Sequence, residues 1–111
     1  MKKILLKEGQ PTVTEAIEKL RVEITNGSKS GISVLKVVHG YGSSGVGGAI
    51  KQAVLPKLRR WKDNAIIKNY MTGEEHFEYG ARHNYLLKKY PELSDTWHSD
   101  RGNPGITFIE L

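Results

Sequence analysis

The chain of 111 residues contains no cysteine and no long apolar run. Without cysteine it has neither disulfides nor thiolate metal ligands, and we expect a cytoplasmic protein. A membrane-spanning helix needs roughly 20 apolar residues, and no run approaches that length. At the start of the chain, the three apolar residues 4–6 are interrupted by Lys7, so they are too few for a signal peptide. The sequence therefore predicts a globular protein with no membrane partner.

Glycine, in contrast, is concentrated in one place. Five of the 12 glycines lie in residues 39–48, which read His-Gly-Tyr-Gly-Ser-Ser-Gly-Val-Gly-Gly. An apolar run at 32–38 precedes this loop and is typical of a buried strand, and 49–55 is typical of a helix. Glycines let several backbone N–H groups converge, and the helix N-terminus adds partial positive charge. The loop therefore predicts an anion site that suits a phosphate group.

Positive charge is in moderate excess, with 17 Lys and Arg against 12 Asp and Glu and a net charge of +5. A surplus of this size favours a polyanion as partner but identifies none. Lys51 and a basic cluster at 57–62, which contains Arg59 and Arg60, follow the glycine loop. This cluster is either a surface that follows phosphates or a solvated helix face.

The loop also matches, letter by letter, the dinucleotide fingerprint through Gly40, Gly42 and Gly45. The acidic residue expected about twenty residues later should end the next strand, whereas Asp63 precedes that strand. The Walker pattern is absent, because no Gly-Lys-Ser/Thr follows the loop. A small-molecule nucleotide or phosphate binder remains the alternative to a protein that binds a polymer.

Two side chains of the loop carry further chemistry. His39 has an ordinary pKa near 6.5, so it suits an acid, a base or a phosphate donor, or it is simply a strand-end histidine held by a backbone hydrogen bond. Tyr41 is the best candidate to stack on a base, because a tyrosine inside a glycine loop has little core to enter.

Periodicity predicts strands at 4–7, 32–38, 65–70 and 106–111. A capping box, Thr12 to Glu15, begins a helix at 13–26 that Asn26-Gly27 should stop. A second helix at 46–60 should kink or split at Pro56, and 81–90 forms a short helix before Pro91. The predicted fold is a two-layer α/β sandwich, roughly βαβαβ(α)β, with a four-stranded mixed sheet.

The order of these pieces resembles the Smr domain, the small MutS-related module, which occurs alone in bacteria and at the C-terminus of MutS2 proteins. Residues 39–42 match its His-Gly-x-Gly motif. Residues 102–107, Gly-Asn-Pro-Gly-Ile-Thr, resemble its Gly-Gly-x-Gly-x-Thr motif, with Asn103 in place of the second glycine. The start of the first helix, at 11–16, also resembles the family. The resemblance implies a single domain over 1–111 with an insertion at about 74–101, before the last strand.

The resemblance implies that the partner is DNA or RNA and, for several members of the family, that the backbone is nicked with the help of a metal. Mg or Mn would then be the cofactor. The expected phosphate- and nucleic-acid-binding residues are His39, Gly40, Tyr41, Gly42, Ser43, Ser44, Gly45, Gly47, Gly48, Lys51, Arg59, Arg60, Gly102, Asn103, Gly105 and Thr107.

The candidate catalytic residues are His39 and Glu8. If the first two strands are parallel neighbours, both residues face the same end of the sheet, although Glu8 is equally consistent with a surface strand end. Many Smr domains carry Leu-Asp-x-His-Gly before the first helix. Aligned on Gly9, this chain reads Leu-Leu-Lys-Glu-Gly and has neither the aspartate nor the histidine. Binding alone and binding with endonuclease activity therefore remain alternatives.

The insertion contains four more residues able to bind metals, His76, His83, His98 and Asp100. Their spacing matches no common metal motif, so we predict no metal site and interpret them as surface or lid residues.

Overall fold

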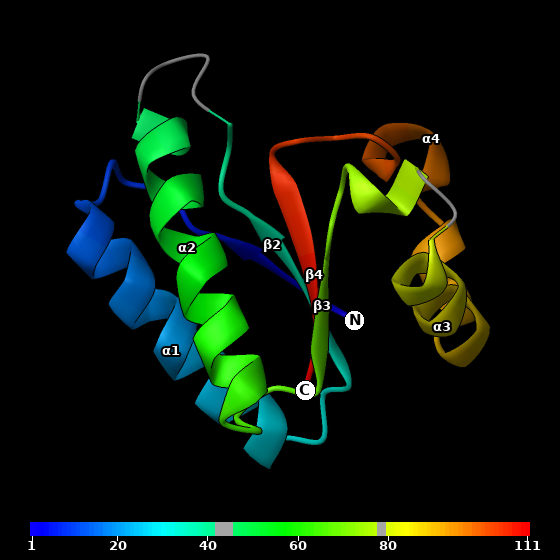
Figure 1. Ribbon diagram of the computed structural model, residues 1–111. Coiled ribbons are helices and arrows are strands. Elements are labelled where there is room, and N and C mark those ends of the chain that lie inside the picture. Colours follow the sequence, from blue (N-terminus) through cyan, green and yellow to red (C-terminus); the bar gives the residue numbers. More distant parts are fainter. Residues whose placement is uncertain (42–45, 78–79) are drawn as a thin grey trace.

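The computed structural model describes residues 1–41, 46–77 and 80–111, which form a four-stranded sheet with helices on both faces (Figure 1). In chain order, the elements are β1 (Lys2–Leu5), α1 (Val13–Lys29), β2 (Val34–Val38), α2 (Val46–Asp63), β3 (Asn69–Thr72), the 3-10 turn η1 (Glu75–Phe77), α3 (Ala81–Lys89), the 3-10 turn η2 (Pro91–Ser94), α4 (Trp97–Asp100) and β4 (Ile106–Glu110). None of the helices in these ranges has both the length and the apolar character needed to cross a membrane.

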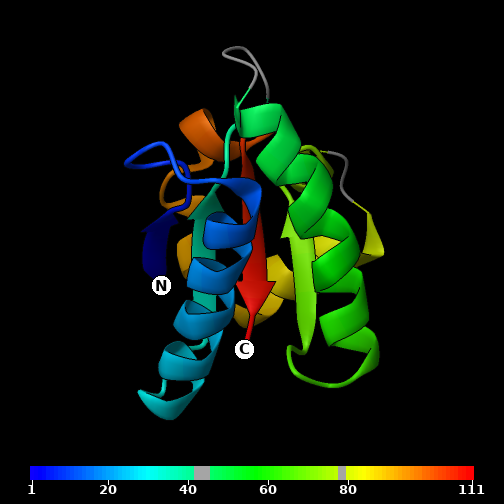
Figure 2. The same ribbon diagram turned by 90° about the vertical axis from the view of Figure 1, so that its left-hand side faces the viewer.

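The strand order is β1-β2-β4-β3, with β1 parallel to β2 and β4 antiparallel to both of its neighbours. Helices α1 and α2 lie side by side on one face (Figure 2), and α3, α4 and the 3-10 turns lie on the other. The predicted α/β sandwich with a mixed four-stranded sheet is confirmed. Residues 74–101 add small helical elements on the second face, so β4 is buried along its whole length.

Two apolar clusters follow from the alternation of side chains across the sheet. Leu35 and Val37 of β2 pack with α1 and α2, in a cluster that includes Leu20 and Leu58. Val34, on the opposite face of β2, belongs to the second cluster, with Met71, Leu86, Leu93 and Phe108. The segment at 74–101 thus supplies the apolar surface that covers the second face of the sheet.

Helix α1 begins as predicted, because the Thr12 hydroxyl accepts from the Glu15 N–H and the Glu15 carboxylate accepts from the Thr12 N–H. The predicted stop at Asn26-Gly27 is wrong, since α1 continues to Lys29. Gly27 is buried, and a Cβ there would lie 2.8 Å from Leu111 Cδ1. That glycine therefore serves close packing, and Gly31, with φ +77°, takes the left-handed conformation after the helix.

One predicted helix break and the positions of two strands also differ from prediction. Helix α2 runs through Pro56 as one helix, so the predicted split does not occur. β3 begins at Asn69 rather than at 65, because Ile66 and Ile67 still donate to the Trp61 carbonyl at the end of α2. β1 lies two residues earlier than predicted, at Lys2–Leu5.

The interpretation of the insertion residues as surface or lid groups is wrong for His76, His83 and Asp100, which are all buried. The two imidazoles lie 5.1 Å apart, and the His76 ring packs 5.2 Å from Phe108. The Asp100 carboxylate accepts from Lys36 of β2 at 2.6 Å. These side chains join the insertion to the second face of the sheet. The side chain of His98 lies outside the described part of the chain.

At the C-terminal end of β4, α3 is attached to the second face of the sheet by Glu110, whose side chain is fully buried. Its carboxylate accepts from Lys89 Nζ at 2.8 Å and from the hydroxyls of Tyr90 at 2.5 Å and Tyr85 at 3.2 Å. Burial alone would raise the pKa of the Glu110 carboxyl, but the hydrogen bonds from Lys89 and the two tyrosines outweigh it and lower that pKa. Burial and the nearby carboxylate raise the pKa of Tyr90 to about 12.

We predict that Glu110→Gln lowers the free energy of unfolding at pH 7 by about 1.5–3 kcal/mol, the range for hydrogen bonds to a charged group. The folded-state pKa of Glu110 lies below its ordinary value of 4.5. Its stabilisation is therefore complete above that value and is lost as the pH falls through the lower folded-state pKa. Urea denaturation between pH 7 and pH 3 measures both effects.

The control is Glu92→Gln, because Glu92 is an exposed acid of η2. It should change stability by less than about 0.5 kcal/mol. Equal losses in the two variants would contradict the role given to Glu110.

Candidate phosphate site at the end of the sheet

Three segments meet at one end of the sheet, which is the upper end in Figure 1. They are residues 39–41 after β2, residues 73–74 after β3 and residues 102–105 before β4. The strands bring them together because β4 runs antiparallel to its two neighbours, so its start lies beside their ends. Residues 39–41 and the turn at 102–105 therefore lie side by side.

A single carbonyl joins the first two segments. The Gly105 carbonyl accepts from the His39 N–H at 2.9 Å and from the Gly40 N–H at 3.0 Å. Gly40 has φ +76°, in the left-handed region that favours glycine. A Cβ on Gly105 would lie 3.3 Å from Tyr41 Cδ1 and 3.4 Å from Gly40 Cα, so glycine permits the close approach.

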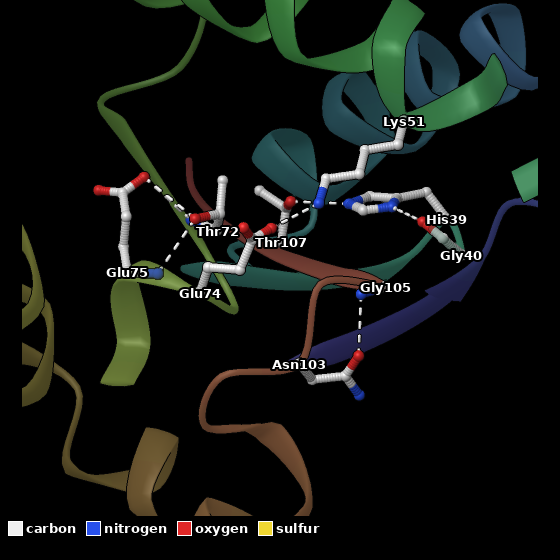
Figure 3. A network of polar contacts seen from close by, with 9 residues as sticks. All are labelled: His39, Gly40, Lys51, Thr72, Glu74, Glu75, Asn103, Gly105 and Thr107. Atoms are coloured by element: carbon white, nitrogen blue, oxygen red, sulfur yellow. Dashed lines mark hydrogen bonds and ion pairs between the residues drawn. The ribbon is translucent and has the colours of Figure 1, made fainter. Parts of the chain in front are cut away.

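The turn after β3 is joined to the same structure. The Gly73 N–H donates to the Ile106 carbonyl at 2.9 Å, and the Gly73 carbonyl accepts from the Gly102 N–H at 2.8 Å. A Cβ on Gly73 would lie 2.0 Å from the Asn103 carbonyl oxygen, so no other residue fits there without a shift of the turn. The Asn103 side chain accepts from the Gly105 N–H at 2.8 Å and thereby shapes the turn (Figure 3).

His39 lies inside this end of the sheet and is fully buried. Its Nδ1 is 2.6 Å from the Gly40 carbonyl and its Nε2 is 2.8 Å from the Thr107 hydroxyl (Figure 3). A carbonyl only accepts, so Nδ1 carries the hydrogen and, in the neutral ring, Nε2 accepts from Thr107.

Burial lowers the pKa of His39, and the charge of Lys51 lowers it further. The Gly40 carbonyl and the Glu74 carboxylate act in the opposite direction but do not restore the ordinary value. His39 is therefore neutral at pH 7, and it links β2, the loop and β4 through hydrogen bonds.

The exposed charges of the site are Lys51 and Glu74. Lys51, in the second turn of α2, donates to Glu74 Oε1, and the two atoms are 2.5 Å apart (Figure 3). The side chain of Glu74 is 51% exposed and that of Lys51 is 19% exposed. Sequence reasoning missed Glu74, although its position immediately after a strand and a glycine was a signal for this edge of the sheet.

Other predicted residues are spread more widely. Tyr41 is 57% exposed beside the turn. Gly47 and Gly48 begin α2, whereas Gly42, Ser43, Ser44 and Gly45 lie outside the described residues. Arg59 and Arg60 are exposed but lie toward the other end of α2, roughly 20 Å along its axis from Val46 at about 1.5 Å per residue.

Glu8 is exposed, after the end of β1, and β1 and β2 are parallel neighbours as the catalytic hypothesis required. It lines a shallow pocket with Lys3 and Lys19. The carboxylate that acts on the charge of His39 is Glu74. Glu74 is held by Lys51, and the described ranges contain no group of three or more His, Cys, Asp or Glu side chains placed to hold a metal ion.

The sheet order and the joined glycine turns define an α/β domain whose polar end lies at the junction of β2, β3 and β4. The Smr domain family model matches residues 9–81, and the chain belongs to this family. The fold is similar to that in the crystal structure of the Smr domain of Thermus thermophilus MutS2, with a TM-score of 0.63, 22% identity, and coverage of 100% of this chain and 98% of that chain. No curated protein matches the chain.

We predict that His39 is neutral at pH 7, with the hydrogen on Nδ1 and an unprotonated Nε2 that accepts from Thr107. Because its pKa is lowered, it should remain neutral as the pH falls through 6.5. Two-dimensional ¹H–¹⁵N spectra of the imidazole rings measure the tautomer and the titration, with His39→Gln to assign the signal. A ring protonated at both nitrogens at pH 6.5 would contradict this placement.

Proposed function

We propose that this Smr domain binds nucleic acid by gripping backbone phosphates with the glycine loop at 39–48 and the neighbouring turn at 102–107. The observation that supports this most is that the Gly105 carbonyl accepts hydrogen bonds from His39 and Gly40 and so joins the two glycine turns. The joined turns lie beside Lys51 and the start of α2. Small residues let a phosphate approach the backbone, and the helix N-terminus and the lysine favour its charge.

The partner that fits best is a polymer rather than a small nucleotide. Arg59 and Arg60 are exposed on the same helix that begins at the loop, roughly 20 Å farther along it. One mononucleotide does not span that distance, whereas a strand with many phosphates does. Exposed Tyr41 lies at the site and offers a face on which a base can stack.

In this proposal the domain binds nucleic acid without a catalytic step. His39, the predicted acid or base, has no exposed surface, and both of its ring nitrogens are in hydrogen bonds within the protein. The exposed carboxylate that acts on the charge of His39 is that of Glu74, which is bound to Lys51. His39 therefore acts as a positioning residue that holds the loop, which suits phosphate recognition.

The main test is the salt dependence of binding. Fluorescence anisotropy with labelled single-stranded and double-stranded DNA and RNA, between 50 and 200 mM salt (about the range in which such contacts weaken strongly), gives the number of phosphates contacted. We expect a log–log slope of roughly −0.7 per contact for single strands and −0.9 for B-form DNA. Competition with inorganic phosphate and mononucleotides separates the small-molecule alternative. Salt-insensitive binding, or binding to none of the four nucleic acids, would contradict the proposal.

A second prediction concerns the ion pair of Lys51 and Glu74. A phosphate at the site must replace the Glu74 carboxylate on Lys51, so Glu74→Gln should strengthen binding about two- to fivefold, as expected for an exposed pair worth up to about 1 kcal/mol. Lys51→Gln should weaken binding and reduce the salt slope by about one contact.

The control is Glu92→Gln, which removes one negative charge from η2, an element of the opposite face. If it strengthens binding as much as Glu74→Gln does, the effect is one of net charge and the assigned role of Glu74 is wrong.

A further inference from the structure

A pocket with two lysines in its lining lies on the opposite face of the sheet from Lys51. It has a volume of about 240 Å³ and opens beside β1, under the turn that leads into β4. Its polar lining comes from Lys3 of β1, Lys36 of β2, Ser99 and Asp100 of α4, and Asn103 of the turn. Among these polar residues, only Asn103 belongs to the predicted phosphate-binding set.

Two lysines lie directly opposite each other in this pocket. Lys3 and Lys36 are Cα partners in the parallel pairing of β1 with β2. Like charges at directly opposed positions are unfavourable, so such a pair needs compensation. Asp100, with a side chain only 3% exposed, neutralises Lys36 at 2.6 Å. Within the described residues Lys3 makes no ion pair, so the pocket keeps one uncompensated positive charge at its rim.

The pocket adjoins the phosphate site at Asn103, which is one of its lining residues. The side-chain oxygen of Asn103 accepts from the Gly105 N–H, and the Gly105 carbonyl in turn accepts from His39 and Gly40. Lys36 lies in β2 and His39 follows the end of that strand, three residues later and roughly 10 Å away at about 3.3 Å per residue. A strand of nucleic acid lying over the turn reaches both places.

We propose that this pocket, which we call the Lys3 pocket, binds a second phosphate of the nucleic-acid strand whose first phosphate lies on the glycine loop. The inference rests on the proposed function. The ligand class is a phosphodiester, because a lysine ammonium recognises a phosphate as a point charge. Val38 and Ile106 supply apolar lining against which the adjoining sugar packs. Asp100 stays with Lys36, because its carboxylate also accepts from the Thr96 hydroxyl.

The test compares Lys3→Gln with Lys2→Gln. Both changes remove one positive charge from β1, but Lys2 pairs with Glu23 of α1, on the opposite face of the sheet. Salt-dependent anisotropy with an oligonucleotide is measured for both variants and the unaltered protein. We expect Lys3→Gln to weaken binding about three- to tenfold and to reduce the salt slope by about one contact, and Lys2→Gln to leave the slope unchanged.

A ¹H–¹⁵N titration with the same oligonucleotide locates the contact. The backbone amides of Lys36 and Ser99 should shift in the unaltered protein and in Lys2→Gln, and shift less in Lys3→Gln. If the protein binds but the two variants have equal slopes, or the Lys36 and Ser99 signals do not move, the Lys3 pocket proposal is overturned while the proposed function stands. If the unaltered protein binds no oligonucleotide, the proposed function itself fails.

Discussion

The Gly105 carbonyl is the acceptor on which the geometry of this domain's polar end depends. It receives two N–H groups, from His39 and Gly40, and so fixes the start of β4 against the end of β2. With the chain held there, Gly40 takes a left-handed conformation directly after the end of β2. The same contact holds His39 beside β4, where the Thr107 hydroxyl hydrogen-bonds the second nitrogen of the His39 ring. The first residues of the glycine loop are therefore positioned by residues more than sixty positions later in the chain.

The sequence predicted best those elements whose signals are local. The capping box that begins α1, the helix at 81–90 and the strand that contains β4 all carry their own boundary residues, and the structure has them. The errors came where a residue acts through tertiary packing. Gly27 resembles a helix stop, yet α1 continues through it. A glycine is needed there because Leu111 lies where a side chain would be. Pro56 stays inside α2, whose apolar face packs on the sheet and outweighs one lost backbone hydrogen bond.

At the site, strand order decided what sequence reasoning was able to find. The two glycine motifs are far apart in the sequence, and they meet because β4 is antiparallel to β2. The sequence left two roles open for His39, a chemically active group or a histidine held by a backbone hydrogen bond. Periodicity does not reveal which side chains at a strand end become buried. Glu74 was missed for the complementary reason. Its partner Lys51 is 23 residues away on another element, and only the fold brings the two together.

The two ion pairs Lys51–Glu74 and Lys36–Asp100 differ in how readily they can separate, and the burial of the carboxylate decides the difference. Lys51 is neutralised by Glu74, whose side chain is half exposed, so water can solvate the carboxylate once a phosphate takes its place. Lys36 is neutralised by Asp100, which is almost fully buried, and separating that pair would leave a charge without solvent. The first pair is therefore exchangeable and the second is structural. By fixing Lys36 in place, Asp100 leaves the neighbouring Lys3 as the charge that an incoming phosphate can compensate.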